Sequence, residues 1–354
     1  TRLFRLNGSH NTLDWHRETV KKIRTAVPNA FILMDIPGIK PRTANASPLK
    51  VSKGQLVSFG KGTNLVDCMH VDLTKDLPSL RSVISAFTIN DGQFVFDEAE
   101  SRGSTIFGRS RQDFILAPRK GLNIPNSIYS ESVQRQIYIE FINKLSDLDI
   151  NGVGLSFVQT ADLVSYVRKL KPNLVLVSKI ENSEGFKNRE EIIRNSDAVM
   201  IDRGDLAAEI GMLDLYRSVE KISQATKAFG RPLIMATENL ETMITRLEPS
   251  KSEVMSLGHS SAIGSDCIML SEETATSANF KNTMTWLHRF LEEEPTGSAV
   301  LQIDQQLREY PPLWQVVKGL PAGSIALFTR SGRALFELMS TSNVHNVTIV
   351  TNNR

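Results

Sequence analysis

The chain has 354 residues, enough for one large hydrophobic core and one or two smaller domains. Its 41 basic and 39 acidic residues give a net charge of +2, which lacks the basic excess of a nucleic-acid-binding protein. Two distant cysteines predict no disulfide framework, and no apolar run approaches the length of a membrane span. We therefore expect a cytoplasmic protein without nucleic-acid or membrane partners.

Short apolar runs alternate with segments of helical periodicity along most of the chain. This alternation is typical of βαβ units and predicts an α/β fold with a parallel sheet. The predicted strands are Leu3–Leu6, Phe31–Met34, Val153–Val158, Leu174–Ile180, Ala198–Ile201, Leu233–Ala236 and Cys267–Leu270. The predicted helices include Leu13–Ala26, Glu131–Leu145, Asp162–Leu170, Ser183–Arg194 and Leu213–Phe229.

Oxygen-bearing side chains follow the first two predicted strands. Asn7 and Ser9 come after the first strand, and Asp35 comes after the second. Oxygen ligands at neighbouring strand ends suit a monovalent cation. The alternative is that Asn7 and Ser9 are turn caps, which such residues equally often are.

The pattern changes between about Ala44 and Gly121. Short alternating runs are separated there by turn residues such as Asp91-Gly92. The runs are Gln55–Phe59, Thr88–Ile89, Gln93–Phe96, Thr105–Phe107 and Asp113–Leu116. They predict a small β-rich domain inserted after a strand of the larger domain.

Ionisable residues end two successive strands near the middle of the chain. Lys179 and Glu181 end one strand and lie on the same face of it, because they are two residues apart. Asp205 follows the next strand. Glu181 and Asp205 are oxygen ligands that suit Mg²⁺ or Mn²⁺. The alternative is a solvated pair of charges, which the repetition on the next strand disfavours.

These residues resemble the active-site segments of pyruvate kinase. The resemblance is carried by Ser178-Lys179-Ile180-Glu181-Asn182 and by Arg203-Gly204-Asp205-Leu206, and it extends over almost the whole chain. It implies a TIM (β/α)8 barrel over 1–43 and 122–295, an inserted small β-barrel lid over 44–121 and a short C-terminal α/β segment over 296–354. The family has its first strand upstream of the segment that begins this chain. We therefore expect either further residues before Thr1 in the natural protein or an unusual closure of the barrel.

The N-terminal segments also resemble the family. Arg5-Leu6-Asn7-Gly8-Ser9-His10 is similar to its phosphate and potassium segment, with Gly8 where an aromatic residue is usual. The resemblance implies a potassium site of Asn7, Ser9, Asp35 and the Ile36 carbonyl. Lys40, however, occupies a position where potassium-independent members carry Lys and potassium-dependent members carry Glu. Its fixed ammonium can replace the charge of the ion, so we predict activity without K⁺.

The resemblance also assigns the nucleotide site. It implies nucleotide contacts by Arg5, Asn7, His10, Arg42 and Lys120, with the two arginines neutralising phosphate oxygens. It places Asp91 at the active-site edge of the lid. The alternatives are that Asp91-Gly92 is only a hairpin turn and that Lys120 is only a loop charge.

The substrate side of the site follows from the same comparison. The resemblance makes Lys179, Thr237, Arg5 and Arg42 catalytic. The Thr237 hydroxyl would help to protonate the enolate through a water relay. The backbone amides of Gly204 and Asp205 would receive the substrate carboxylate. Without the family, Thr237 would be read as a cap. Ser271, Glu273 and Thr274 match the last strand end of the family.

Three acidic residues depart from the family pattern on this face. Asp202, Glu238 and Glu272 each replace a residue that is normally neutral. They raise the repulsion of an anionic substrate, which puts the substrate or its affinity in question. Near the C-terminus, Thr329 to Arg333 resembles the family's phosphate-binding turn for a sugar-phosphate effector, within a predicted βαβ unit of Ser324–Phe328, Ser331–Met339 and Val347–Val350.

Three functions follow. The first is a pyruvate kinase-like phosphotransferase that acts on phosphoenolpyruvate and ADP with Mg²⁺ or Mn²⁺, and we expect it to be a homo-oligomer. The second is another metal-dependent enolpyruvate enzyme, such as an aldolase, and the third is a non-catalytic relative. Lys179, Lys120, the two arginines and the lid favour the first, because an aldolase has no phosphoryl group to hold.

Overall fold

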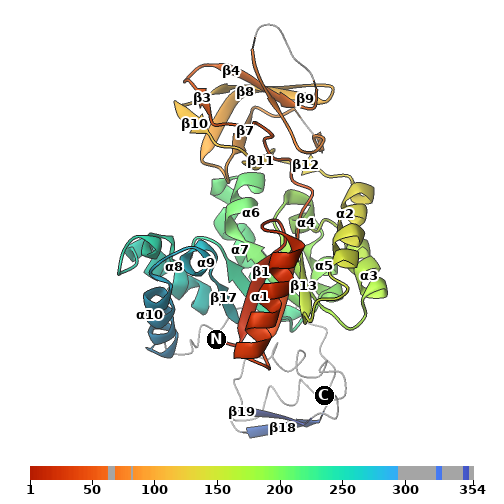
Figure 1. Cartoon of the computed structure of the whole chain (residues 1–354), viewed down its shortest axis with the longest axis vertical. Helices are drawn as coiled ribbons and strands as arrows, with labels where there is room; N and C mark the ends of the chain where they lie inside the picture. Colours follow the sequence, from red (N-terminus) through yellow and green to blue (C-terminus); the bar gives the residue numbers. More distant parts are fainter. Residues whose placement is uncertain (63–67, 81–82, 294–323, 329–345, 351–354) are drawn as a thin grey trace. The chain divides into compact units, whose positions relative to one another are not determined.

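The computed structural model describes residues 1–62, 68–80, 83–293, 324–328 and 346–350 (Figure 1). The chain divides into two compact units. The first consists of Thr1–Asn188 and Gly204–Tyr216, and the second of Arg189–Arg203 and Arg217–Arg354. Within the described ranges, no helix is both long and apolar enough to cross a membrane.

The first unit contains parallel strands that hydrogen-bond in the order β1-β2-β13-β14. Their bounds are Leu3–Asn7, Phe31–Ile36, Gly152–Leu155 and Val175–Ile180. All of β13 is buried, and β2 and β14 are buried beyond their first residue. Such continuous burial is typical of parallel strands covered on both faces. The connecting helices are α1 (Leu13–Ala26), α2 (Glu131–Lys144) and α3 (Ala161–Leu170), of which α2 and α3 pack together (Figure 1).

The strand register brings polar residues to one edge of this sheet. Asn7 pairs with Asp35, and Asp35 pairs on its other side with Gly154. Leu155 pairs with Ser178, the residue before Lys179. Because the strands are parallel, their carboxyl ends lie at the same edge, as predicted.

Two predicted elements end differently in the structure. The strand expected over Val153–Val158 stops at Leu155, because Phe157 has a left-handed backbone (φ 59°) that leaves the strand. The helix expected over Ser183–Arg194 is broken into α4 (Ser183–Lys187) and α5 (Arg189–Asn195). Asn188 lies at the break, where its side chain donates a 2.8 Å hydrogen bond to the carbonyl of Gln159.

A second sheet of the first unit has the order β11-β7-β8-β9-β4-β5. These strands, in chain order, are β4 (Leu56–Gly60), β5 (Met69–Asp72), β7 (Ala86–Ile89), β8 (Phe94–Arg102), β9 (Thr105–Ser110) and β11 (Leu122–Asn123). Short pairs are formed by β3 (Leu49–Val51) with β10 (Phe114–Leu116) and by β6 (Ser79–Leu80) with β12 (Ser127–Ile128). Phe59, Phe87 and Phe96 pack ring against ring in a separate core. The β-rich character of this region was predicted, whereas the strands β3, β5, β6, β11 and β12 were not.

The second unit contains parallel strands in the order β15-β16-β17, which span Ala198–Asp202, Leu233–Ala236 and Cys267–Met269. Its later elements are the 3-10 helix η1 (Glu241–Ile244), α8 (Lys251–Ala262), α9 (Glu272–Ala275) and α10 (Phe280–Glu293). Leu240, Met243, Leu257 and Leu287 form a buried cluster among them. Helices α6 (Arg203–Ile210) and α7 (Met212–Ala228) lie along the chain between β15 and β16.

Near the C-terminus, β18 (Ser324–Phe328) and β19 (Asn346–Val350) form a parallel pair. The predicted strands there are confirmed, the second starting one residue earlier than predicted. The predicted helix Ser331–Met339 and the phosphate-binding turn Thr329 to Arg333 lie outside the described residues.

Candidate functional site

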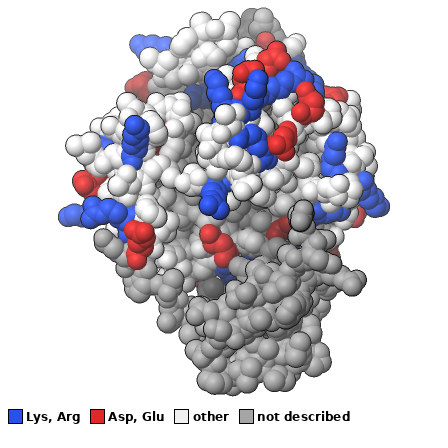
Figure 2. Space-filling model, turned by 60° about the horizontal axis from the view of Figure 1, so that its bottom comes forward, with Lys and Arg blue, Asp and Glu red and all other residues white. Residues whose placement is uncertain are grey.

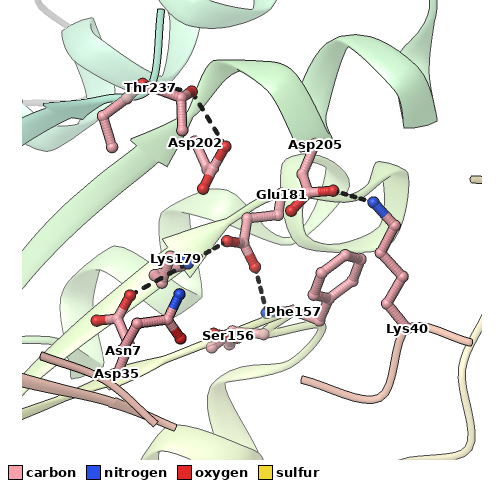
Figure 3. A network of polar contacts seen from close by, with 12 residues as sticks. Asn7, Asp35, Lys40, Ser156, Phe157, Lys179, Glu181, Asp202, Asp205 and Thr237 are labelled. Carbon is pink, nitrogen blue, oxygen red and sulfur yellow. Dashed lines mark hydrogen bonds and ion pairs between the residues drawn. The ribbon is translucent and has the colours of Figure 1, made fainter. Parts of the chain in front are cut away.

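A buried carboxylate, Asp35, lies at the end of β2 between two cations. Arg5 donates to its Oδ2 from Nε (3.0 Å) and from Nη2 (2.7 Å), and Lys179 Nζ lies 3.4 Å from the same oxygen (Figure 3). Burial alone would raise the pKa of Asp35, but the charges of Lys179 and Arg5 hold it below its usual value. Asp35 is therefore ionised at neutral pH, and it orients both cations.

Glu181 lies directly after β14 and is fully buried. Lys179 Nζ is 2.6 Å from its Oε1, and the backbone amide of Phe157 donates a 2.7 Å hydrogen bond to its Oε2 (Figure 3). The residue with the left-handed backbone, Phe157, is therefore also the one whose amide donates to Glu181. The predicted proximity of Lys179 and Glu181 is confirmed.

Asp205 lies in the first turn of α6, where the N–H groups of a helix favour a negative charge. Lys40 forms an ion pair with Asp205 Oδ1 (Figure 3). Its Nζ also lies 2.9 Å from Asp91 Oδ1. Burial would raise the pKa of Asp205, but the charge of Lys40 outweighs it, so the pKa is lowered. These contacts join Lys40, Asp91 and Asp205, three residues far apart in the sequence.

Glu181 and Asp205 fit a divalent cation. Each offers a carboxylate oxygen, and these oxygens lie within 4.8 Å of one another. A hard divalent cation prefers such anionic oxygens. The structure thus brings the two predicted ligands together, and their role as metal ligands stays a prediction.

In the second unit, the turn after β16 has an unusual backbone. Thr237 and Glu238 both have positive φ, 61° and 51°. Thr237 Oγ1 donates a 3.1 Å hydrogen bond to Asp202 Oδ1, since the register aligns Asp202 with Ala236 (Figure 3). A β-branched residue in this conformation is a backbone outlier and marks a constrained turn.

Arg203 holds this turn. Its Nη2 donates to the carbonyls of Thr237 (2.5 Å) and Glu238 (2.8 Å) and to Asn239 Oδ1 (2.9 Å). Its Nη1 donates to Ser256 Oγ at 2.5 Å. The planar fork of a guanidinium is suited to several acceptors at once, so Arg203 stabilises a conformation that Thr237 alone would not favour.

Arg42 and Lys120 lie on two paired backbone segments. Thr43 donates from its amide to the carbonyl of Lys120 (2.9 Å), and Arg42 forms an isolated bridge with Gly121. Arg42 Nη1 donates a 3.1 Å hydrogen bond to the carbonyl of Arg119. The structure thus brings the predicted nucleotide-binding cations Arg42 and Lys120 to neighbouring positions.

The first turn of the chain is built by Asn7 and Ser9. Asn7 Oδ1 accepts a 3.0 Å hydrogen bond from the amide of Ser9, which is the capping contact that the sequence left open. Ser9 and His10 are exposed. A β-carbon built on Gly8 would lie 2.2 Å from Phe141 Cζ. The ring of Phe141 therefore fills the space where a side chain at position 8 would lie.

The structure adds two residues that sequence reasoning missed. Glu209 is fully buried, and burial raises its pKa to about 8. Lys75 Nζ donates a 2.5 Å hydrogen bond to the carbonyl of Gly38, and burial followed by the like charge of Arg42 lowers its pKa. Glu209 lies one helical turn after Asp205, which is a weak signal in the sequence, whereas Lys75 has no such signal.

Parallel strands that carry a lysine and two carboxylates at their ends define an α/β protein with a candidate cation site. Residues 1–283 match the family described as "Pyruvate kinase, barrel domain". The cytosolic isozyme of pyruvate kinase from Nicotiana tabacum is 31% identical over 294 residues, which cover 77% of this chain and 57% of that protein. Pyruvate kinase from Thermococcus litoralis is 30% identical over 288 residues, covering 77% and 59%. The chain belongs to the pyruvate kinase family.

The chain spans somewhat more than half the length of these relatives. Pyruvate kinase from Hypocrea jecorina, at 29% identity over 293 residues, is covered over 54% of its length. The family resemblance found in the sequence is therefore confirmed over the segment that carries Lys179, Glu181 and Asp205.

Proposed function

We propose that this chain is the catalytic part of a divalent-metal-dependent pyruvate kinase, which transfers the phosphoryl group of phosphoenolpyruvate to ADP. The observation that carries the proposal is the cluster in which Lys179 lies 2.6 Å from Glu181, with an oxygen of Asp205 within 4.8 Å of Glu181. A site that combines a fixed cation with two metal-binding carboxylates suits the transfer of a charged phosphoryl group.

Glu181 and Asp205 would hold Mg²⁺ or Mn²⁺. When bound, this ion would supply positive charge to the oxygens of the transferring group. Lys179 would add its own charge at that group, because Asp35 and Glu181 fix its ammonium from two sides. Arg5, oriented by Asp35, would bind a phosphate oxygen.

Arg42 and Lys120 would bind the phosphates of ADP, with His10 and Asn7 at the same nucleotide site. Lys75, whose pKa is lowered in part by Arg42, adds a further cation to this region. Figure 2 shows basic and acidic side chains interspersed on the face that it presents, without a field of one sign. A local group of cations therefore serves a small phosphorylated ligand better than a nucleic acid.

The substrate carboxylate would bind the backbone amides of Gly204 and Asp205 at the start of α6. In the reaction, an oxygen of the ADP β-phosphate bonds to phosphorus as the bond to the enol oxygen breaks. The resulting enolate takes a proton at its methylene carbon, and Thr237 would help to deliver that proton. The hydrogen bond from Thr237 Oγ1 to Asp202 supports a fixed hydroxyl in this role.

The potassium requirement concerns Asp35 and Lys40. Asp35 Oδ1 is buried and has no hydrogen-bond partner among the described residues, which supports a cation ligand beside Asn7 and Ser9. The described carboxylate partners of Lys40 are Asp205 and Asp91. We propose that Lys40 replaces the ion through this charge network, so that K⁺ is not required.

The finer architecture belongs to the same proposal. The separate core of the β11-β7-β8-β9-β4-β5 sheet supports a lid over 44–121, inserted into a TIM (β/α)8 barrel over 1–43 and 122–295. Residues 296–354 would form a partial α/β domain. A cytoplasmic homo-oligomer is the expectation from the family, and the name of the cytosolic tobacco relative supports the location.

The test is product formation from phosphoenolpyruvate and ADP with Mg²⁺, followed by phosphorus NMR with and without K⁺. Pyruvate and ATP should form in both salts and disappear in a Glu181→Ala variant. Absence of ATP while Mn²⁺ still binds at Glu181 would indicate another enolpyruvate substrate, to which the added carboxylates Asp202, Glu238 and Glu272 would be relevant. Absence of both would indicate a non-catalytic relative.

A further inference from the structure

The ammonium of Lys40 is shared between two carboxylates. It pairs with Asp205 Oδ1 and lies 2.9 Å from Asp91 Oδ1. Lys40 is only 5% exposed, whereas Asp91 is 61% exposed and Asp205 is 20% exposed. The Lys40 ammonium is therefore buried between Asp205, which is mostly buried, and Asp91, which is mostly exposed.

The backbone of Gly121 lies close to the Lys40 side chain. A β-carbon built on Gly121 would lie 2.6 Å from Lys40 Cε and 2.9 Å from its Nζ. Gly121 also accepts a 3.0 Å hydrogen bond at its carbonyl from the amide of Asn90, the residue before Asp91. The Lys40 side chain thus lies close to Gly121, whose carbonyl is bonded to the residue before Asp91.

The position of Lys40 bears directly on the cation site. Asp205 supplies one of the two proposed metal-ligand carboxylates, and a divalent cation there would meet the Lys40 ammonium as a competitor or as a like charge. Asp91 offers Lys40 a second acceptor outside the metal pair.

We propose that Lys40 is a positioning residue that sets the divalent-cation affinity of Asp205. Binding of the cation displaces the ammonium from Asp205 and leaves it on Asp91, so the turn that carries Asp91 responds to the occupancy of the metal site. The inference rests on the metal site of the proposed function, which it deepens.

The experiment measures Mn²⁺ binding to the full chain without substrates, by the electron paramagnetic resonance signal of free Mn²⁺. Lys40→Met should bind Mn²⁺ about tenfold more tightly, because the competing charge is gone. Asp91→Asn should bind it about threefold more weakly, because Lys40 then has Asp205 as its sole carboxylate partner among the described residues. Asn tolerates the positive φ of position 91 (53°), so the turn is retained.

A matched control separates this effect from net charge. Lys53→Met removes an exposed lysine elsewhere in the 44–121 segment and should leave Mn²⁺ affinity within about twofold of the wild type. Opposite shifts in Lys40→Met and Asp91→Asn would support the proposal. Equal or weaker binding by Lys40→Met, relative to Lys53→Met, would overturn it.

Three further outcomes distinguish the role of Lys40 from the metal site itself. If Lys40→Met does not fold, tighter or unchanged binding in Asp91→Asn overturns the proposal by itself. If Mn²⁺ binds and Glu181→Gln abolishes the binding while the Lys40 and Asp91 variants change nothing, the metal site holds and the role of Lys40 fails. If no variant and no wild-type chain binds Mn²⁺, the metal site and this inference fail together.

Discussion

The Tyr129 hydroxyl donates a 3.1 Å hydrogen bond to Glu209 Oε1, and both side chains are buried. Ser127 Oγ donates to the other carboxylate oxygen at 3.4 Å. Burial outweighs these contacts and the nearby charge of Lys40, so the pKa of Glu209 rises from 4.5 to about 8. Glu209 is therefore a protonated acid in the folded chain at neutral pH.

This pKa gives a stability prediction with a defined sign. Between pH 4.5 and about 8, Glu209 is ionised in the unfolded chain and protonated in the folded chain, so its stabilising contribution falls as pH rises through that window. A Glu209→Gln variant lacks this slope, which is at most about 1.4 kcal/mol per pH unit. Urea unfolding at pH 5, 6.5 and 8 should show the variant gaining stability relative to the wild type. A constant difference across that range would contradict the raised pKa.

Lys179 carries the clearest prediction for activity. Lys179→Met leaves Asp35 and Glu181 as buried carboxylates without its charge, and it removes the cation proposed to contact the transferring phosphoryl group. We expect the rate of ATP formation to fall by about 10³-fold or more. Lys187→Met, at an exposed lysine of α4, should retain the wild-type rate. Retention of activity within tenfold in Lys179→Met would refute the assignment.

The sequence predicted the parallel strands because each is an almost continuous apolar run between polar residues. The helix predicted at about Leu13–Ala26 matches α1, because its periodicity stops before Pro28; the structure adds the cap at Thr12. The break between α4 and α5 was missed because Asn188 depends on a tertiary contact with Gln159. Local periodicity contains no information about such a contact.

Some features of the candidate site were likewise predictable from the sequence, and others were not. The pair Lys179 and Glu181 followed from its spacing on one strand, and Asp205 followed from the repeated pattern of strand ends. The ion pair of Lys40 with Asp205 joins residues 165 positions apart in the chain, which no periodicity reports. The positive φ of Thr237 was also unpredictable. It depends on the hydrogen bonds that Arg203 donates to the turn, and not on the local propensity of threonine.

The hydrogen bonds by which Arg203 stabilises the turn after β16 can be tested by mutation. Arg203→Lys keeps the charge but removes the planar fork that reaches Thr237, Glu238 and Asn239. We expect a loss of about 2 kcal/mol in the free energy of unfolding, because hydrogen bonds to a charged donor are lost around a strained turn. Arg231→Lys, at an arginine that donates to the carbonyl of Arg194 and makes no described contact with this turn, should cost less. Equal effects in thermal or urea unfolding would show that the fork is not needed.

The ion pair of Arg5 and Asp35 predicts a large loss of stability when only one of its two residues is replaced. Asp35 is 1% exposed and Arg5 is 19% exposed, so Arg5→Leu leaves a buried carboxylate with Lys179 as its remaining described cation. Breaking such a pair from one side costs about 3–5 kcal/mol. Adding Asp35→Asn removes the unpaired charge, so the double variant should regain about half or more of that loss. Urea unfolding of both single variants and the double variant would measure the coupling. Additive losses would mean that Arg5 and Asp35 stabilise the fold independently.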